Sequence, residues 1–179
     1  MHKFKLTLCA LLLTTASASA LAADETQGTV TFNGELYAET CSIASDSVDV
    51  QVTLPKVSIQ TLKASADAAG SKGFDLNVEN CPVGITQVAA HFEAISSSGV
   101  NSATGNLTNQ YQGASAKASN VEVRLYNSDE KQLKLGETGA PAQVSNGKAT
   151  MRYYGGYYAT AATTAGLVYA QARYTLAYP

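Results

Sequence analysis

The segment that decides the fold is Gly-Leu-Val-Tyr-Ala-Gln-Ala-Arg-Tyr-Thr-Leu-Ala-Tyr-Pro, the last fourteen residues of the sequence, 166–179. From Val168 onward, every second residue is apolar or aromatic. Successive side chains of a β-strand point to opposite faces, so this period of two predicts a strand with one buried face. The residues of that face are Val168, Ala170, Ala172, Tyr174, Leu176 and Tyr178.

The same alternation recurs along the rest of the chain and predicts further half-buried strands. The predicted strands lie within Gly28–Tyr37, Val48–Leu54, Phe74–Val78, Val88–Ile95, Val121–Leu125, Gln132–Leu135, Ala142–Val144 and Ala149–Tyr154. Asn146-Gly147 separates the last two of these runs and predicts a tight hairpin turn, because both residues tolerate a positive φ.

One segment, Val57–Ala69, has helical rather than strand spacing, with Ile59, Leu62 and Ala66 on one face. This spacing predicts a helix that need be only a turn or two long. The other predicted elements are short strands separated by turn signals. Such a sequence is typical of a β-sandwich or a β-barrel.

Composition limits the class of protein further. With 179 residues, 45% of them hydrophobic and 15% charged, the chain fits one globular domain rather than a disordered segment. Its formal charge of −2 gives no reason to expect a nucleic-acid partner.

The first 22 residues predict a secretory signal peptide. Lys3 and Lys5 form a basic start, an apolar run follows, and Ala20-Leu21-Ala22 fits a small-residue cleavage site. Cleavage there would remove Cys9 and leave Cys41 and Cys81 in an exported chain. Two cysteines in an oxidising compartment predict one disulfide, with two free buried thiols as the less favoured alternative.

No pattern in the sequence indicates catalysis, a cofactor or a metal. His91 is the one histidine after the predicted leader, and it falls on the polar face of its strand. Two cysteines and one histidine are too few ligands for a zinc site. Acidic pairs such as Asp129 and Glu130 lie in predicted turns, where solvated side chains are the ordinary case.

Four tyrosines gather around Gly155-Gly156, namely Tyr153, Tyr154, Tyr157 and Tyr158. Tyrosine suits half-buried sheet positions because its ring is buried while its hydroxyl stays hydrogen-bonded. We therefore interpret the cluster as strand and edge packing, with a carbohydrate-stacking surface as the alternative.

Several short motifs together resemble one family. The first is Gly-Thr-Val-Thr-Phe-Asn-Gly-Glu-Leu at 28–36, which is followed by Cys41-Ser42-Ile43; the others are Gly166 and the penultimate Tyr178. In combination they resemble the pilins of the chaperone–usher pathway. The chain is similar to the major subunits of type 1 and P pili, and its tyrosine-rich end resembles type 3 fimbriae.

The resemblance implies an all-β fold, an incomplete immunoglobulin-like β-sandwich that is completed by a donor strand from a neighbouring subunit. It divides the chain into a signal peptide (1–22), an N-terminal donor-strand extension (23–40) and a pilin domain (41–179). The implied donor residues are Gly28, Val30, Phe32, Gly34 and Leu36. The residues implied for the groove edge and for chaperone recognition are Gly166, Val168, Tyr174, Leu176 and Tyr178.

The implied function is that of a structural subunit, the major pilin of a bacterial fimbria, which polymerises by donor-strand exchange and supports cell adhesion. Its implied partners are other fimbrial subunits, a periplasmic chaperone and an outer-membrane usher. It would be exported through the periplasm to the cell surface. A minor or adaptor subunit and a tip-associated adhesin are the alternatives, and a small outer-membrane β-barrel is a more remote one.

Overall fold

The structure is a computed structural model that describes residues 28–34 and 40–179. The chain divides into two units, Met1–Leu36 and Tyr37–Pro179, and the fold belongs to the second. The expected signal peptide (1–22) and the expected donor residue Leu36 lie outside the described residues. Among those that are described, no helix has the length and apolar character needed to cross a bilayer.

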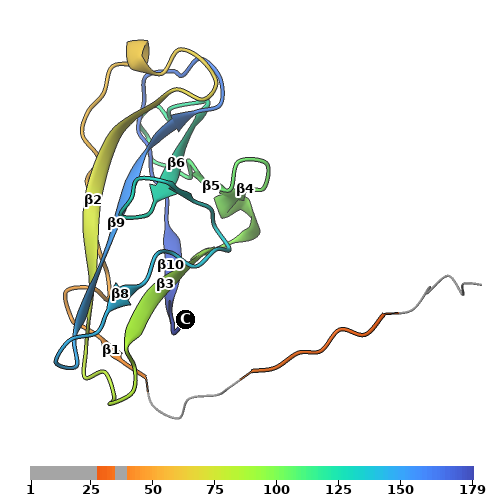
Figure 1. The fold of residues 1–179 in the computed structure, drawn as a ribbon. Helices are drawn as coiled ribbons and strands as arrows, with labels where there is room; N and C mark the ends of the chain where they lie inside the picture. Colours follow the sequence, from red (N-terminus) through yellow and green to blue (C-terminus); the bar gives the residue numbers. More distant parts are fainter. Residues whose placement is uncertain (1–27, 35–39) are drawn as a thin grey trace, which may run out of the picture. The chain divides into compact units, whose positions relative to one another are not determined.

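Within residues 40–179 the chain forms two antiparallel sheets (Figure 1). The larger has seven strands in the order β1-β2-β9-β6-β5-β4, with β7 also paired to β6. Its strands are β1 (Ser42–Ile43), β2 (Ala68–Glu79), β4 (Val100–Asn101), β5 (Asn106–Thr108), β6 (Val121–Tyr126), β7 (Gln132–Leu133) and β9 (Ala149–Ala159). The smaller has the order β10-β3-β8, formed by β3 (Gln87–Ala94), β8 (Ala142–Gln143) and β10 (Ala172–Ala177).

The long pair β2 and β9 supplies much of the core, as the alternation of its residues predicts. The register sets Phe74 opposite Tyr153, Leu76 opposite Met151 and Val78 opposite Ala149. Directly opposed apolar side chains on one face of a sheet pack together, so one face of the pair is buried. Val88, Ala90 and Phe92 of β3 belong to the same core cluster. The predicted strands in these three segments are confirmed.

The disulfide joins the start of the domain to Cys81, and the predicted hairpin turn lies next to Cys81. Cys41 and Cys81 are bridged across a sequence separation of 40. At the hairpin, Asn146 and Gly147 have φ values of 52° and 70°, which the turn requires. The Gly147 carbonyl accepts a hydrogen bond from the Cys81 backbone N–H at 3.0 Å. The turn therefore supports one end of the disulfide.

Within Val57–Ala69, where a helix of a turn or two is expected, the structure forms one turn, and it is a 3₁₀ turn rather than an α-helix. Only a single 3₁₀ turn forms, Ile59–Thr61, and the Ser58 side chain caps it by accepting from the Gln60 N–H. Ala66 has a φ of 76°, outside the helical region, and β2 already begins at Ala68. Leu62 is only 3% exposed, so the apolar spacing marks burial in a loop rather than a helix.

The strand expected over Val48–Leu54 is also absent, and the expected C-terminal strand is paired in a sheet only from Ala172 onward. Residues 48–54 and 168–171 therefore belong to neither sheet. They line opposite sides of one groove in the sandwich. The alternation correctly marks half-buried segments, but a strand also requires a regular ladder of backbone hydrogen bonds, and neither segment forms such a ladder with the described residues.

Candidate functional site: an open groove in the sandwich

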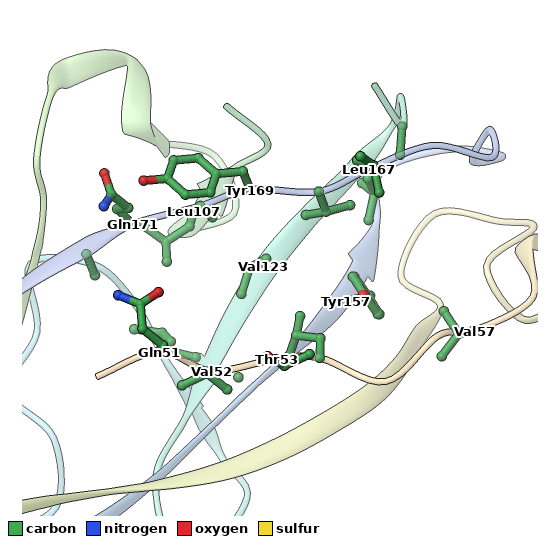
Figure 2. Close-up of a pocket in the computed structure, with 18 of the residues that line it drawn as sticks. Gln51, Val52, Thr53, Val57, Leu107, Val123, Tyr157, Leu167, Tyr169 and Gln171 are labelled. Atoms are coloured by element: carbon green, nitrogen blue, oxygen red, sulfur yellow. The ribbon is translucent and has the colours of Figure 1, made fainter. Parts of the chain in front are cut away.

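A groove with a volume of about 980 Å³ opens between two segments of the second unit. One wall is residues 48–57, called here the first edge, and the other is residues 166–171, called the second edge. Figure 2 shows Gln51, Val52 and Thr53 on one side and Leu167, Tyr169 and Gln171 on the other, with Val123 of β6 between them.

The floor of the groove is the hydrophobic core itself. The core residues that line it come from β2, β3, β5 and β6, and they are Phe74, Leu76, Phe92, Leu107, Val121, Val123 and Leu125. Phe92 packs edge-on against Phe74, with ring centroids 6.5 Å apart, and tilted against Tyr174 at 6.2 Å. The apolar side chains of Val48, Leu167 and Tyr169 are exposed at the edges of this groove, so the groove presents an apolar binding surface.

Within the described part of the chain, the first edge has no backbone partner. Among the described residues, no backbone–backbone hydrogen bond involves any residue from Val48 to Val57. The one side-chain bond within this edge, from the Gln51 amide to the Asp49 carboxylate at 2.7 Å, leaves the backbone groups unpaired. A run of unpaired N–H and C=O groups is a template for an additional strand.

The second edge is paired on one side only. The Leu167 N–H donates to the Ala116 carbonyl at 2.8 Å, and the Tyr169 carbonyl accepts from the Gln110 N–H at 2.7 Å. Within the described part of the chain, Gly166, Val168 and Ala170 take part in no backbone hydrogen bond. Polar groups of successive residues point to alternate sides of an extended chain, so those of the unpaired residues face the groove.

The geometry therefore describes a β-sandwich that lacks one strand. Two edges with unpaired backbone border a groove whose floor is apolar. Such a site can take up an extended peptide, with the edges supplying hydrogen bonds and the floor supplying contacts for alternate side chains.

Comparison with known proteins shows which family has this architecture. The sequence pattern of the family described as "Fimbrial protein" matches residues 30–179. The chain belongs to the fimbrial protein family.

Two relatives show how far the similarity extends. The F17 fimbrial protein of Escherichia coli is 38% identical over 177 residues, which cover 93% of this chain and 94% of the relative. The major fimbrial subunit SMF-1 of Stenotrophomonas maltophilia is 38% identical over 173 residues, which cover 90% of this chain and 98% of the relative.

A solved structure shows the same fold. The P pilus rod subunit PapA superimposes with a TM-score of 0.61 at 18% identity, covering 79% of this chain and all of that one. Together with the two curled sheets and the unpaired edges, this likeness assigns to the fimbrial subunit an incomplete immunoglobulin-like β-sandwich. The predicted fold class is confirmed.

The C-terminal tyrosines of the fimbrial subunit hold the first residues of its domain. The Tyr178 hydroxyl accepts a hydrogen bond from the Cys41 N–H at 3.0 Å, and the Tyr174 hydroxyl donates to the Ser47 carbonyl at 2.6 Å. The Ser47 hydroxyl oxygen in turn accepts from the Asn77 N–H of β2 at 2.8 Å. The segment from Cys41 to Ser47, which leads into the first edge, is thereby fixed between the two sheets.

Burial raises the pKa of the Tyr174 phenol, and the negative charge of Asp46 raises it further. Burial likewise raises the pKa of Tyr153, although the hydrogen bond from the Ala90 N–H acts in the other direction. Both phenols therefore keep their protons at physiological pH. They can then donate to the carbonyls of Ser47 and Ala140, respectively.

The tyrosine cluster separates onto two faces of β9. Tyr153 is fully buried and Tyr157 lines the groove, whereas Tyr158 lies on the other face, where the Arg124 guanidinium stacks on its ring at 3.6 Å. Tyr154 shares that face and covers Gly73 of β2. All four make packing contacts within the sheet, as the first interpretation of the cluster predicts.

Two parts of the site were not identified from the sequence: the first edge, and Asn109, which lies beside the second edge. The first edge was interpreted only as a strand, since alternation does not distinguish a paired strand from an unpaired one. Asn109 was not singled out at all, because a polar side chain that binds remote backbone has no periodic signal. By contrast, His91 lies where the alternation predicts, half-exposed on β3, and its Nδ1 is 2.9 Å from the Thr138 hydroxyl.

Gly166 lies where the second edge crosses another segment of backbone. A Cβ atom at this position would collide with backbone atoms of Ala116, Lys117 and Ala118. Backbone cannot move aside as the end of a flexible side chain can, so only glycine fits without displacing the edge.

We expect Gly166→Ala to destabilise the subunit by about 1–3 kcal/mol, the usual range for an overpacked site. Urea unfolding of the monomer, followed by tyrosine fluorescence, measures the change. Gly99→Ala is the matched control, because a Cβ there would lie 3.4 Å or more from its neighbours. Equal stability of the two variants would contradict the close approach at Gly166.

Proposed function

We propose that this fimbrial protein is the major structural subunit of a bacterial fimbria and that it polymerises by donor-strand exchange. The groove of one subunit receives the N-terminal extension of the next, and the chain of such contacts forms the fibre. The observation that carries the proposal is the groove itself. Its two edges have backbone groups that find no partner among residues 28–34 and 40–179, and they border an apolar floor.

The extension has the character of a donor strand. In the described residues 28–34, Val30 is 76% exposed and Phe32 is 90% exposed. Both lie on one face of the alternating pattern together with Gly34. Burial of each apolar side chain in a groove would contribute about 1.5–3 kcal/mol. Donor residues Gly28 to Leu36 therefore match the groove in chemistry, and assignment of 23–40 as the extension and 41–179 as the domain follows from this role.

A subunit with an unfilled groove between two unpaired edges needs protection before assembly. We propose that a periplasmic chaperone first covers the groove and that an outer-membrane usher then directs exchange with the next subunit, so that the protein passes through the periplasm to the cell surface. In this account the C-terminal segment that includes Gly166, Val168, Tyr174, Leu176 and Tyr178 forms the groove edge that the chaperone recognises. The name of the relative SMF-1, a major fimbrial subunit, supports the major rather than the minor role.

The proposed role is structural and non-catalytic. The polymer supports cell adhesion by displaying many copies of the subunit on the surface. No cofactor is required for strand addition, because backbone hydrogen bonds and apolar contacts supply the binding energy.

A single substitution in the extension tests the assembly mechanism. We expect Gly34→Asn to abolish fibres, because the position opposite Gly34 in the neighbour's groove would leave no room for a side chain. The amount of chaperone-bound subunit in the periplasm should stay unchanged, since the substitution does not alter residues 41–179. Electron microscopy of the cells and immunoblots of periplasmic extracts provide the two measurements.

Thr31→Asn is the matched control for this test. It places the same side chain three residues earlier, on the opposite face of the strand, where it would point away from the groove. We expect fibres in normal number. Abundant fibres from Gly34→Asn, or loss of fibres from both variants alike, would refute the proposed role of Gly34 as a groove-facing donor residue.

A further inference from the structure

One amide side chain, that of Asn109, makes four hydrogen bonds next to the groove. Its Nδ2 donates to the carbonyls of Ala118 at 2.9 Å and Leu167 at 3.0 Å. Its Oδ1 accepts from the N–H groups of Tyr111 at 3.1 Å and Tyr169 at 3.0 Å. Two donors and two acceptor positions are all that a side-chain amide has, so its capacity is fully used.

Two of these bonds replace a missing part of the backbone ladder. The segment beside the second edge pairs with it through the backbone of Gln110, Ala116 and Ala118. The described residues between them, 111–115, make no backbone hydrogen bond to this edge. The Tyr169 N–H has no backbone acceptor there and is bound by the Asn109 side chain instead. The same side chain reaches the Leu167 carbonyl, which also accepts from the Ala118 N–H at 3.1 Å.

The orientation of the edge follows from these contacts. With the polar groups of Leu167 and Tyr169 held on the outer side, those of Gly166, Val168 and Ala170 must face the groove. If the outer bonds of Leu167 and Tyr169 were lost, this stretch could rotate or fray. An incoming strand would then find no ordered row of partners.

We infer that Asn109 is a positioning residue for strand uptake, which keeps the second edge in the conformation that an incoming strand can pair with. This inference rests on the proposed function. Asn109 touches neither the groove floor nor the incoming strand, yet it determines how quickly that strand is bound. The conformational entropy of ordering the second edge is lost during folding and not during binding.

The substitution that tests this role best is Asn109→Asp in the full exported chain. The side chain keeps its shape and its acceptor oxygen, but a carboxylate oxygen replaces the donor that faces the Ala118 and Leu167 carbonyls. The matched control is Asn120→Asp, because the Asn120 amide also binds a backbone carbonyl, that of Ala162 at 2.8 Å, outside the second edge. Asn109→Ser is a second variant, which removes most of the bonds without adding charge.

The rate of polymerisation of purified monomer is followed by the growth of bands that resist SDS, and amide exchange at Tyr169 is followed by NMR. We expect Asn109→Asp to polymerise about tenfold more slowly than the unaltered chain, from the loss of two hydrogen bonds, and its Tyr169 amide to exchange faster. Asn109→Ser should change both in the same direction, and Asn120→Asp neither. On acidification, protonation of the introduced carboxyl restores one donor and should recover part of the rate.

The outcomes separate this inference from the proposed function. If the unaltered monomer does not polymerise, the proposed function itself is wrong, and the inference fails with it. If the unaltered chain polymerises and both Asn109 variants do so at its rate, only the inference is overturned. The inference is also overturned if Asn120→Asp, at a melting temperature equal to that of the Asn109 variants, slows polymerisation as much as they do. That result would indicate that a general loss of stability, rather than the position of the second edge, sets the rate.

Discussion

Deletion of residues 23–36 should abolish polymerisation completely while leaving a soluble subunit bound to its chaperone. The deletion removes Val30, Phe32 and Gly34 but none of the residues that form the two sheets. If the segment acts as a donor in trans, the groove of the shortened subunit stays intact and only its ability to fill a neighbour's groove is lost. Co-purification with the chaperone and electron microscopy of the cells measure the two parts of this result.

A shorter deletion provides the control. Removal of residues 23–27 alone keeps Gly28–Leu36 and should still permit fibres. An ordinary closed domain predicts a different outcome, because the longer deletion would then remove an internal strand and expose its partners. Unfolding or degradation of the 23–36 deletion in the presence of chaperone would contradict the account.

Removal of the disulfide should have the second largest effect. The bridge between Cys41 and Cys81 closes a loop of 40 residues at the point where the domain begins. In the chain-entropy view, such a loop contributes about 4 kcal/mol, a large share of the stability of a small domain. We expect the double variant Cys41→Ala, Cys81→Ala to lose about this much free energy of unfolding and to fall sharply in periplasmic amount.

Alkylation of the unaltered subunit checks the starting point of this prediction. Under native, non-reducing conditions, Cys41 and Cys81 should not react, and the intact mass should be lower by two hydrogens. Denaturant titration of both proteins then gives the difference in stability. A loss of less than about 1 kcal/mol would show that the bonds from Tyr178 and Tyr174 to this segment suffice without the bridge.

The sequence predicts the paired strands of the sandwich well, for a physical reason. The segments around Leu76, Phe92 and Val123 each pack one face on the core and are paired on the sheet, so burial and pairing coincide. Alternation reports burial directly. Where a segment is half-buried and also has a partner, the strand prediction is therefore correct.

The same signal fails where burial and pairing separate. Val50 and Val52 alternate as strand residues do, yet their segment, the first edge of the groove, has no backbone hydrogen bond to any residue that the structure describes. Leu62 follows helical spacing and is buried, but it lies in a loop after a single 3₁₀ turn. In both cases the pattern correctly marks the residues that contact the core. It does not determine the backbone conformation or the hydrogen bonding of the segment that contains them.

The candidate site divides in a similar way. Gly166 and Tyr178 stand out in the sequence, and the structure gives each a local reason, a close backbone approach for one and a bond to the start of the domain for the other. Asn109 cannot be found in this way, because its partners at Leu167 and Tyr169 are about sixty residues distant in sequence. Only the folded chain brings that amide to the groove.

The most direct test of the central claim, a sandwich that lacks one strand, is complementation by a peptide. A synthetic peptide of residues 23–40 is added to the subunit from which residues 23–36 have been deleted, as it is released from its chaperone. The account predicts a one-to-one complex of much higher melting temperature than the free subunit, with dissociation too slow to follow over hours, because a whole strand with its ladder and apolar contacts is restored. A subunit that ignores the peptide and keeps the same melting temperature would contradict the claim.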